Sequence, residues 1–235
     1  MRCRRSFAVA VTAATLLWGT PATAGATSNH LVAIWEMNES PGAQTMLDSS
    51  GHGLRGWIGG EVEAGVWVGG ATGYRFSRLE PDTPPTHPRH LAIVPDTSAL
   101  DPGSRDYAVT IRLRTTEKFG NIVQKGQATA NGGNFKLQIP SGIVQCLFRG
   151  SAGSLLVAAP RAINDGGWHT VRCVRTRAGL TLIVDGSPVA RRSGPTGWID
   201  NAWPLSIGGK TSCDQISVGC DYFAGDLDYV AIEAA

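Results

Sequence analysis

The sequence predicts an all-β protein made of two packed antiparallel sheets. Short apolar segments recur along the chain, 30 glycines are available for turns, and no segment carries the long 3.6-residue apolar period of an amphipathic helix. Strands that each bury one face are satisfied when two sheets pack face to face. Because chains of this length commonly form one sandwich, we expect a single domain over residues 25–235.

The clearest strand pattern lies in residues 165–186, DGGWHTVRCVRTRAGLTLIVDG. His169, Val171 and Cys173 share one parity of the first half, and alternate residues of the second half, at 180, 182 and 184, are apolar. Each half can therefore bury one face of an antiparallel strand. Asp185 and Gly186 can supply the positive φ angles of a tight hairpin, after which the chain folds back.

The N-terminus resembles a signal peptide. Arginines at positions 2, 4 and 5 precede an apolar run over residues 7–18, and Ala22-Thr23-Ala24 has the small-residue spacing that signal peptidase recognises. We expect cleavage after Ala24 and a secreted, extracellular protein. The apolar run is shorter than the roughly 20 residues that span a bilayer, so no membrane span is expected in the mature chain. Arg4-Arg5-Ser6-Phe7 resembles a twin-arginine export pattern, and a short basic segment serves the general secretory route equally well.

The charge balance gives no support to nucleic-acid binding. Three of the 21 basic residues and none of the 19 acidic residues lie in residues 1–24, which leaves 18 against 19. Nucleic-acid recognition normally shows as a dense face of lysine and arginine. Arg172, Arg175 and Arg177 lie close together in the sequence, and we interpret them as solvent-facing strand residues.

Cysteine number and spacing predict disulfides. Five cysteines become four when Cys3 leaves with the signal peptide, and an even set in an exported protein is typical of disulfide bonding. Four cysteines allow three connectivities. Cys213 and Cys220 flank a short polar loop, while Cys146 and Cys173 lie on two strand segments, so we expect these two pairs. A zinc site is the competing interpretation, but the 213/220 spacing does not match zinc-ligand spacing.

Seven segments occur in an order that resembles a known family. They are WEMNESPGAQTMLDSSGHGLRG (35–56), DYAVTIRLRTT (106–116), GNIVQKG (120–126), DGGWHTVRCVR (165–175), LTLIVDG (180–186), PLSIGGK (204–210) and DYFAGDLDYVAIE (221–233). Together they resemble a laminin G-like domain of the concanavalin A-like lectin and glucanase superfamily, of the type common in secreted bacterial proteins. The resemblance implies a two-sheet jelly roll in which binding is commoner than catalysis.

Carboxylate spacing predicts no catalytic site. Related glycanases carry acidic residues that alternate along one strand, so that two carboxylates face one cleft. Asp226 and Asp228 share a face, but Glu233 falls on the opposite parity of an unbulged strand. We therefore expect the protein not to be an enzyme.

The same resemblance implies a structural calcium ion where the two ends of the chain meet. Glu39, Asp48 and Asp228 occupy the matching acidic positions. Calcium needs six to eight oxygen ligands, and the turn that begins at Asp48 can offer a carboxylate together with carbonyl oxygens. In the alternative, Asp48 caps its own turn and Asp228 pairs with a nearby donor.

Tryptophans indicate where a ligand could bind. Trp35 and Trp168 lie at motif positions and are expected to pack in or against the core. The segment GPTGWIDNAWP carries the aromatic residues Trp198 and Trp203, with Asp200 and Asn201 between them. Sugars stack their C–H faces on aromatic rings and bind polar groups through their hydroxyls. These four residues are therefore a candidate sugar-binding platform; alternatively, both rings cover a sheet edge or an apolar seam.

Together these patterns predict a secreted, non-catalytic binding module that recognises carbohydrate or a glycosylated surface. One alternative is an extracellular protein-interaction domain of the cell envelope, because the same fold binds proteins through its rim loops. The other is a divergent glycan hydrolase or lyase. A concave groove lined by tryptophan favours sugar, whereas a flat apolar patch favours a protein partner.

Overall fold

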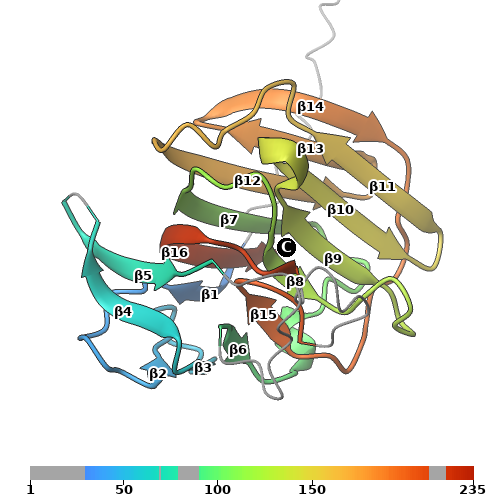
Figure 1. Ribbon diagram of the computed structural model, residues 1–235. Helices are drawn as coiled ribbons and strands as arrows, with labels where there is room; N and C mark the ends of the chain where they lie inside the picture. The colour runs from blue at the N-terminus through green and yellow to red at the C-terminus, as the bar shows by residue number, and fades with distance from the viewer. Residues whose placement is uncertain (1–29, 69, 79–89, 212–220) are drawn as a thin grey trace, which may run out of the picture.

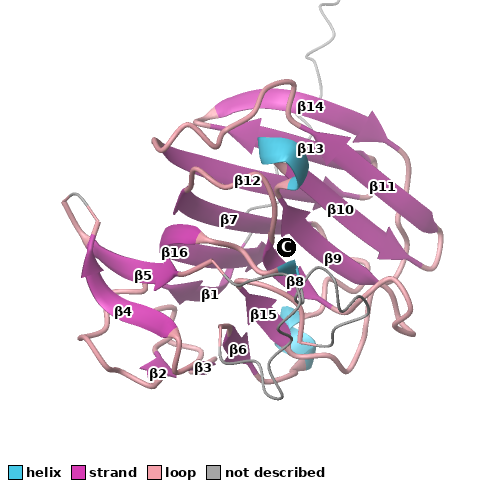
Figure 2. Cartoon of the chain, in the orientation of Figure 1, coloured by secondary structure: helices cyan, strands magenta, loops and turns pink. Residues whose placement is uncertain are grey.

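The structure is a computed structural model that describes residues 30–68, 70–78, 90–211 and 221–235. The predicted all-β class is confirmed: two antiparallel sheets, here named sheet A and sheet B, pack against each other, with two short 3₁₀ turns in the described chain (Figures 1 and 2). This is the arrangement of a jelly-roll sandwich.

Sheet A runs in the order β14-β13-β12-β7-β16-β5-β4, and β1 also pairs with β16. Its strands are β1 (His30–Trp35), β4 (Val62–Trp67), β5 (Thr72–Phe76), β7 (Tyr107–Arg114), β12 (Trp168–Thr176), β13 (Gly179–Val184), β14 (Ser187–Ser193) and β16 (Gly225–Ala234). Strand β16 pairs with β5 near its start and with β1 over its second half. The first and last described strands are therefore neighbours in the same sheet (Figure 1).

Sheet B runs in the order β11-β10-β9-β8-β15-β6-β3-β2. Its strands are β2 (Thr45–Met46), β3 (Gly56–Ile58), β6 (Ala92–Val94), β8 (Asn121–Lys125), β9 (Asn134–Gln138), β10 (Gln145–Gly150), β11 (Gly153–Ala158) and β15 (Leu205–Ile207). The 3₁₀ turns are η1 (Ser98–Leu100) and η2 (Pro140–Gly142).

One hydrophobic core fills the space between the sheets. At its centre, Tyr107 from sheet A packs on Phe135 and Phe148 from sheet B, with ring centroids 5.4 and 6.2 Å away. The Tyr107 hydroxyl donates to the Leu100 carbonyl at 2.8 Å, so its polar atom is satisfied inside the core. Trp35 is also fully buried, as expected, and its indole N–H donates to the Leu54 carbonyl at 2.7 Å.

The Cys146–Cys173 disulfide is present. It joins β10 of sheet B to β12 of sheet A, and both cysteines are fully buried. The other expected pair, Cys213 and Cys220, lies outside the described residues, as does the expected signal peptide. In the described part of the chain no helix has the length and apolarity to cross a membrane.

The hairpin prediction for residues 165–186 is confirmed. Strands β12 and β13 pair antiparallel, and Val171 and Cys173 face the core. At the next turn Asp185 and Gly186 have φ angles of 50° and 77°. The Asp185 carboxylate also accepts a hydrogen bond from the Thr170 backbone N–H at 2.9 Å, which ties the turn to β12.

A bulge in β16 corrects the predicted geometry of its carboxylates. The pairing of β16 with β7 shifts register between Leu227 and Tyr229. As a result Leu227 and Val230 both face the core, although they are three positions apart. The extra residue reverses the parity of the strand, so Asp226 and Glu233 lie on the same outer face. The expectation that Glu233 faces away from Asp226 was wrong because it assumed an unbulged strand.

Candidate functional site

The candidate sugar platform lies on the loop between β14 and β15, next to the turn that joins β10 and β11. Trp198 is 55% exposed, while its backbone is fixed: its N–H donates to the Ser151 hydroxyl at 2.9 Å and its carbonyl accepts from Ser151 N at 3.0 Å. A Cβ at Gly103 would lie 3.8, 3.9 and 4.0 Å from three carbons of the indole six-membered ring. These near-equal distances show that one face of the ring lies on Gly103, while more than half of the residue stays exposed.

The four residues of the platform have different surroundings. Asp200 is exposed, and the Trp198 indole N–H approaches its carboxylate at 3.4 Å. Trp203 is half-buried. Asn201, in contrast, is buried and its side chain is satisfied by the protein: Nδ2 donates to the Gly133 carbonyl at 3.1 Å and Oδ1 accepts from the Trp203 N–H at 3.0 Å. Asn201 therefore anchors the loop, and the ligand-facing part of the platform reduces to Trp198, Asp200 and Trp203.

Lys125 holds the same loop from inside. Its side chain is fully buried, and its ammonium donates to the Asn201 carbonyl at 2.6 Å and to the carboxylates of Asp96 and Asp101 at 2.8 and 2.7 Å. Burial raises the pKa of Asp101, and the ion pair with Lys125 offsets this only in part. The loop path is therefore fixed by a charge that solvent cannot reach.

Arg175 is a second internal anchor of the loop. The prediction that it faces solvent was wrong. It shares the parity of Val171 and Cys173 and is only 3% exposed, rather than facing solvent. Its guanidinium donates to the Thr196 hydroxyl at 2.8 Å, to the carbonyls of Gly103 and Arg105 at 3.1 and 2.9 Å, and to the Gly197 carbonyl. Burial lowers its pKa. Its core-facing parity was the sequence signal that could have revealed this role.

The three residues expected to bind calcium are each engaged separately. Asp48 accepts hydrogen bonds from the N–H groups of Ile34, Ser50 and Leu54 and from the Ser50 hydroxyl, at 2.8–3.1 Å. Burial acts to raise the Asp48 pKa, but these hydrogen bonds outweigh it and the pKa is lowered.

The other two carboxylates also have protein partners. Glu39 accepts from the Leu47 N–H at 2.6 Å and from the Tyr74 hydroxyl at 2.5 Å, and Asp228 pairs with Arg112. Among the described residues no group of three or more acidic, histidine or cysteine side chains is placed to hold a metal ion. The residues present therefore do not fit a shared calcium ion in this structure, because Asp48 already accepts four protein donors and the three carboxylates are not gathered into one cluster.

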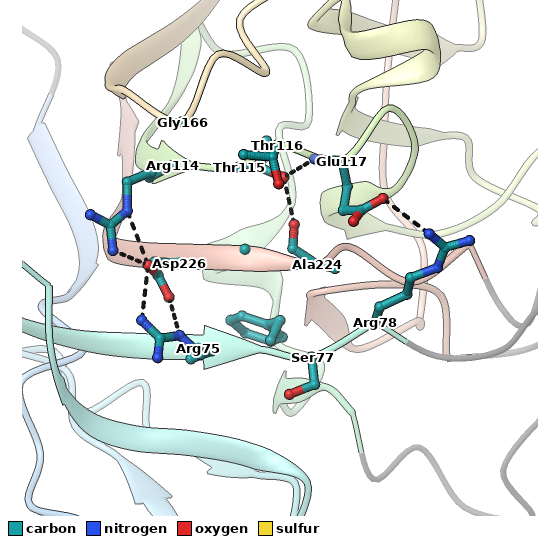
Figure 3. A pocket seen from close by; sticks show the side chains of 12 residues that line it. Arg75, Ser77, Arg78, Arg114, Thr115, Thr116, Glu117, Gly166, Ala224 and Asp226 are labelled. Atoms are coloured by element: carbon teal, nitrogen blue, oxygen red, sulfur yellow. Dashed lines mark hydrogen bonds and ion pairs between the residues drawn. The ribbon is translucent and has the colours of Figure 1, made fainter.

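The carboxylates of β16 form an ion-pair layer on the outer face of sheet A. Figure 3 shows Asp226 between two arginines, with Arg75 Nε at 2.8 Å and Arg114 Nε at 3.1 Å. These residues line a hollow of about 300 Å³ whose other ion pair, Arg78 with Glu117, spans 3.5 Å. Farther along the strand Asp228 pairs with Arg112 and Glu233 with Arg172. Although the bulge places the three carboxylates on one face, each is neutralised by arginine.

Trp168 lies on this layer rather than in the core, contrary to expectation. It sits opposite Arg114 in the pairing of β12 with β7. The guanidinium carbons of Arg112 and Arg114 lie 4.6 and 5.2 Å from its ring centroid, and its indole N–H donates to the Val68 carbonyl at 3.1 Å. Cation–π contacts thus replace the predicted core packing.

The outer face of sheet B carries a smaller hollow that sequence reasoning missed. It has a volume of about 150 Å³, and its floor is the cross-strand row Gln124, Lys136 and Leu147, from β8, β9 and β10. Asn134 and Arg149 also line it. The only sequence signal was the presence of polar residues at alternate positions of otherwise apolar strands.

Comparison with known proteins identifies relatives of this sandwich. Over 101 residues the chain is 31% identical to neurexin-1a-beta of Danio rerio. The match covers 43% of this chain and 22% of that protein. Over 110 residues the chain is 31% identical to laminin subunit alpha-1 of Mus musculus. This match covers 44% of this chain and 4% of that protein. The matched part is thus a small fraction of each relative's length.

A solved structure shares most of the fold. It is domain 4 of AbnA, a GH43 extracellular arabinanase from Geobacillus stearothermophilus, in complex with arabinotriose. The TM-score is 0.63 at 13% identity, over 88% of this chain and 93% of that chain. At this identity the likeness shows a common fold. Residues 89–234 also match the laminin G family model described as the concanavalin A-like lectin/glucanases superfamily. With strand order, core and family model in agreement, the chain belongs to the laminin G-like branch of the concanavalin A-like lectin/glucanases superfamily.

Proposed function

We propose that the protein is a non-catalytic extracellular module that binds carbohydrate or a glycosylated surface through the loop that carries Trp198. The observation that carries this proposal is the indole ring, which is 55% exposed on a backbone that is hydrogen-bonded on both sides. An exposed aromatic ring already held in place stacks on a sugar face without first losing conformational freedom. The nearby Asp200 carboxylate is an acceptor for sugar hydroxyls.

Three further observations support the proposal. The fold neighbour from the arabinanase is a domain seen with an oligosaccharide. The acidic residues of β16 are ion-paired to arginines, whereas a glycosidase needs two carboxylates free to act on one bond. The buried Cys146–Cys173 disulfide is typical of proteins that work outside the cell.

Glycan-array screening of the recombinant protein, followed by calorimetry on the best ligand, tests this function. Trp198→Ala should weaken binding about tenfold or more, which corresponds to about 1.4 kcal/mol. Trp67→Ala is the matched control because Trp67 is also exposed, at 70%, but lies on β4 of sheet A. Both variants should keep the thermal midpoint of the parent. A protein that binds no glycan, or a Trp198→Ala variant with parental affinity, contradicts the proposal.

A further inference from the structure

The hollow on sheet B is lined by polar side chains that are themselves largely buried. Gln124 and Asn134 are 4% and 3% exposed, yet both line the hollow. Lys136, Arg149 and Lys210 complete its charged lining. Among the described residues that line it, none is aspartate or glutamate. Contacts with neighbouring residues decide which amide atoms of this lining donate hydrogen bonds and which accept them.

The orientation of the Gln124 amide follows from a chain of contacts that begins at Asp221. This carboxylate is ion-paired with Lys210 and acts as a hydrogen-bond acceptor. Asn121 Nδ2 lies 3.4 Å from the Asp221 carboxylate and 3.0 Å from Gln124 Oε1. Gln124 must therefore accept through its oxygen, and its Nε2 group keeps both N–H donors without a bond among the described residues.

The orientation of the Asn134 amide is fixed in the same way from the other side. A guanidinium can only donate, and Arg149 Nε lies 2.8 Å from Asn134 Oδ1. Asn134 Nδ2 is consequently a donor, again with no acceptor among the described residues. Arg149 is held in place because its Nη2 donates to the carbonyls of Gln127 and Ala130 at 2.7 and 3.2 Å.

We propose that this hollow binds an oxyanion, the carboxylate or sulfate group of an acidic sugar residue. The inference rests on the proposed function for the ligand being a glycan, and it names the class of glycan. An oxyanion has only acceptors and matches the amide N–H donors of the hollow, whose described lining has cations at Lys136, Arg149 and Lys210, the last of them paired with Asp221. A neutral sugar hydroxyl brings its own O–H donor, which would meet no carboxylate among the described residues of the lining. About 150 Å³, roughly the liquid volume of five water molecules, accommodates one charged group with part of its ring.

The hollow is structurally connected to the Trp198 loop. Asp200 N–H donates to the Gly132 carbonyl at 2.8 Å and Asn201 Nδ2 donates to the Gly133 carbonyl, and the next residue is Asn134. An acidic sugar residue in the hollow and a sugar residue stacked on Trp198 would thus contact parts of the protein that are hydrogen-bonded to each other.

Asn134→Asp tests the donor polarity. The carboxylate keeps an acceptor for Arg149 but removes the N–H donors and adds a negative charge. Gln145→Glu is the matched control: Gln145 Oε1 accepts from Gln138 Nε2 at 2.8 Å, so the change preserves that bond and adds the same charge on β10, outside the hollow.

Binding is measured by calorimetry with three oligosaccharide series of equal length: neutral galactose, galacturonate and sulfated galactose. The parent protein should bind at least one acidic series tenfold or more tighter than the neutral series, and the better series tells carboxylate from sulfate. Asn134→Asp should remove that preference and leave the neutral affinity within twofold, while Gln145→Glu should keep the preference.

Inorganic sulfate supplies an independent readout, because it should shift the side-chain amide NMR signals of Gln124 and Asn134. Binding of neutral sugars without any acidic preference overturns this inference and leaves the proposed function standing. Parental acidic affinity in Asn134→Asp also overturns it. Absence of binding to every series overturns both proposals.

Discussion

Removing the Cys146–Cys173 crosslink gives the sharpest test of how the two sheets are held together. The bond joins the sheets across a sequence separation of 27 residues. In the chain-entropy model a loop of this length contributes about 3.6 kcal/mol at 25 °C. For a domain of this size that is a fall in thermal midpoint of about 7–14 °C. Both cysteines are fully buried, so truncation to alanine adds a packing cost and the figure is a lower bound.

The change is the double substitution Cys146→Ala and Cys173→Ala, because chemical reduction would also open any bridge between Cys213 and Cys220. Urea unfolding under oxidising conditions should show a lower midpoint and a slightly larger m value, since the unfolded chain without the crosslink exposes more surface. Loss of core packing alone would lower the midpoint at constant m. A loss of unfolding free energy below about 1 kcal/mol would refute the reasoning from loop closure.

Four other predictions follow from contacts in the structure. Lys125→Met should cost about 3 kcal/mol of unfolding free energy in urea titration, because it leaves the buried Asp101 carboxylate without its cation. Burial acts to lower the pKa of His169, but its hydrogen bonds to two aspartates outweigh this and raise it. Protonated His169 therefore stabilises the fold fully below about pH 6.5, and this contribution is lost as the pH rises through the raised pKa. The difference in unfolding free energy between the parent and His169→Gln should shrink over that range. In Gly132→Ala the new Cβ would lie 1.6 Å from the Asp200 carbonyl, so the loop must move and the thermal midpoint should fall by several degrees. Chelation of calcium should leave the thermal midpoint unchanged; a drop would show that an ion is bound.

The sequence was sufficient for the strands because period-two burial depends on local alternation. The 165–186 hairpin and its positive-φ turn were predictable in this way. The outer face of β16 was not, because a bulge adds one residue and reverses parity without any change in composition. Arg175 shows a similar limit: its parity pointed inward, but the acceptors that pair with it come from loops distant in sequence.

The candidate site was predictable only in part, for a related reason. Exposed aromatics on a polar loop marked Trp198, whereas the burial of Asn201 depends on Gly133, which lies 68 residues away along the chain. The hollow on sheet B could not be predicted from the sequence because it is formed by side chains from three paired strands. Which of their amides donate is decided by Asp221 and Arg149, and no local pattern encodes that choice.

The way the Trp198 loop is fastened has a consequence for how this surface can diversify. Lys125 and Arg175 hold it by the main-chain oxygens of Asn201 and Gly197, and Ser151 holds it by the peptide groups of Trp198. None of these attachments depends on what the residues at 198 and 200 carry beyond Cβ. The side chains at these two positions can therefore be substituted while the main chain of the loop keeps its path. New ligand preferences can then arise at this loop one substitution at a time.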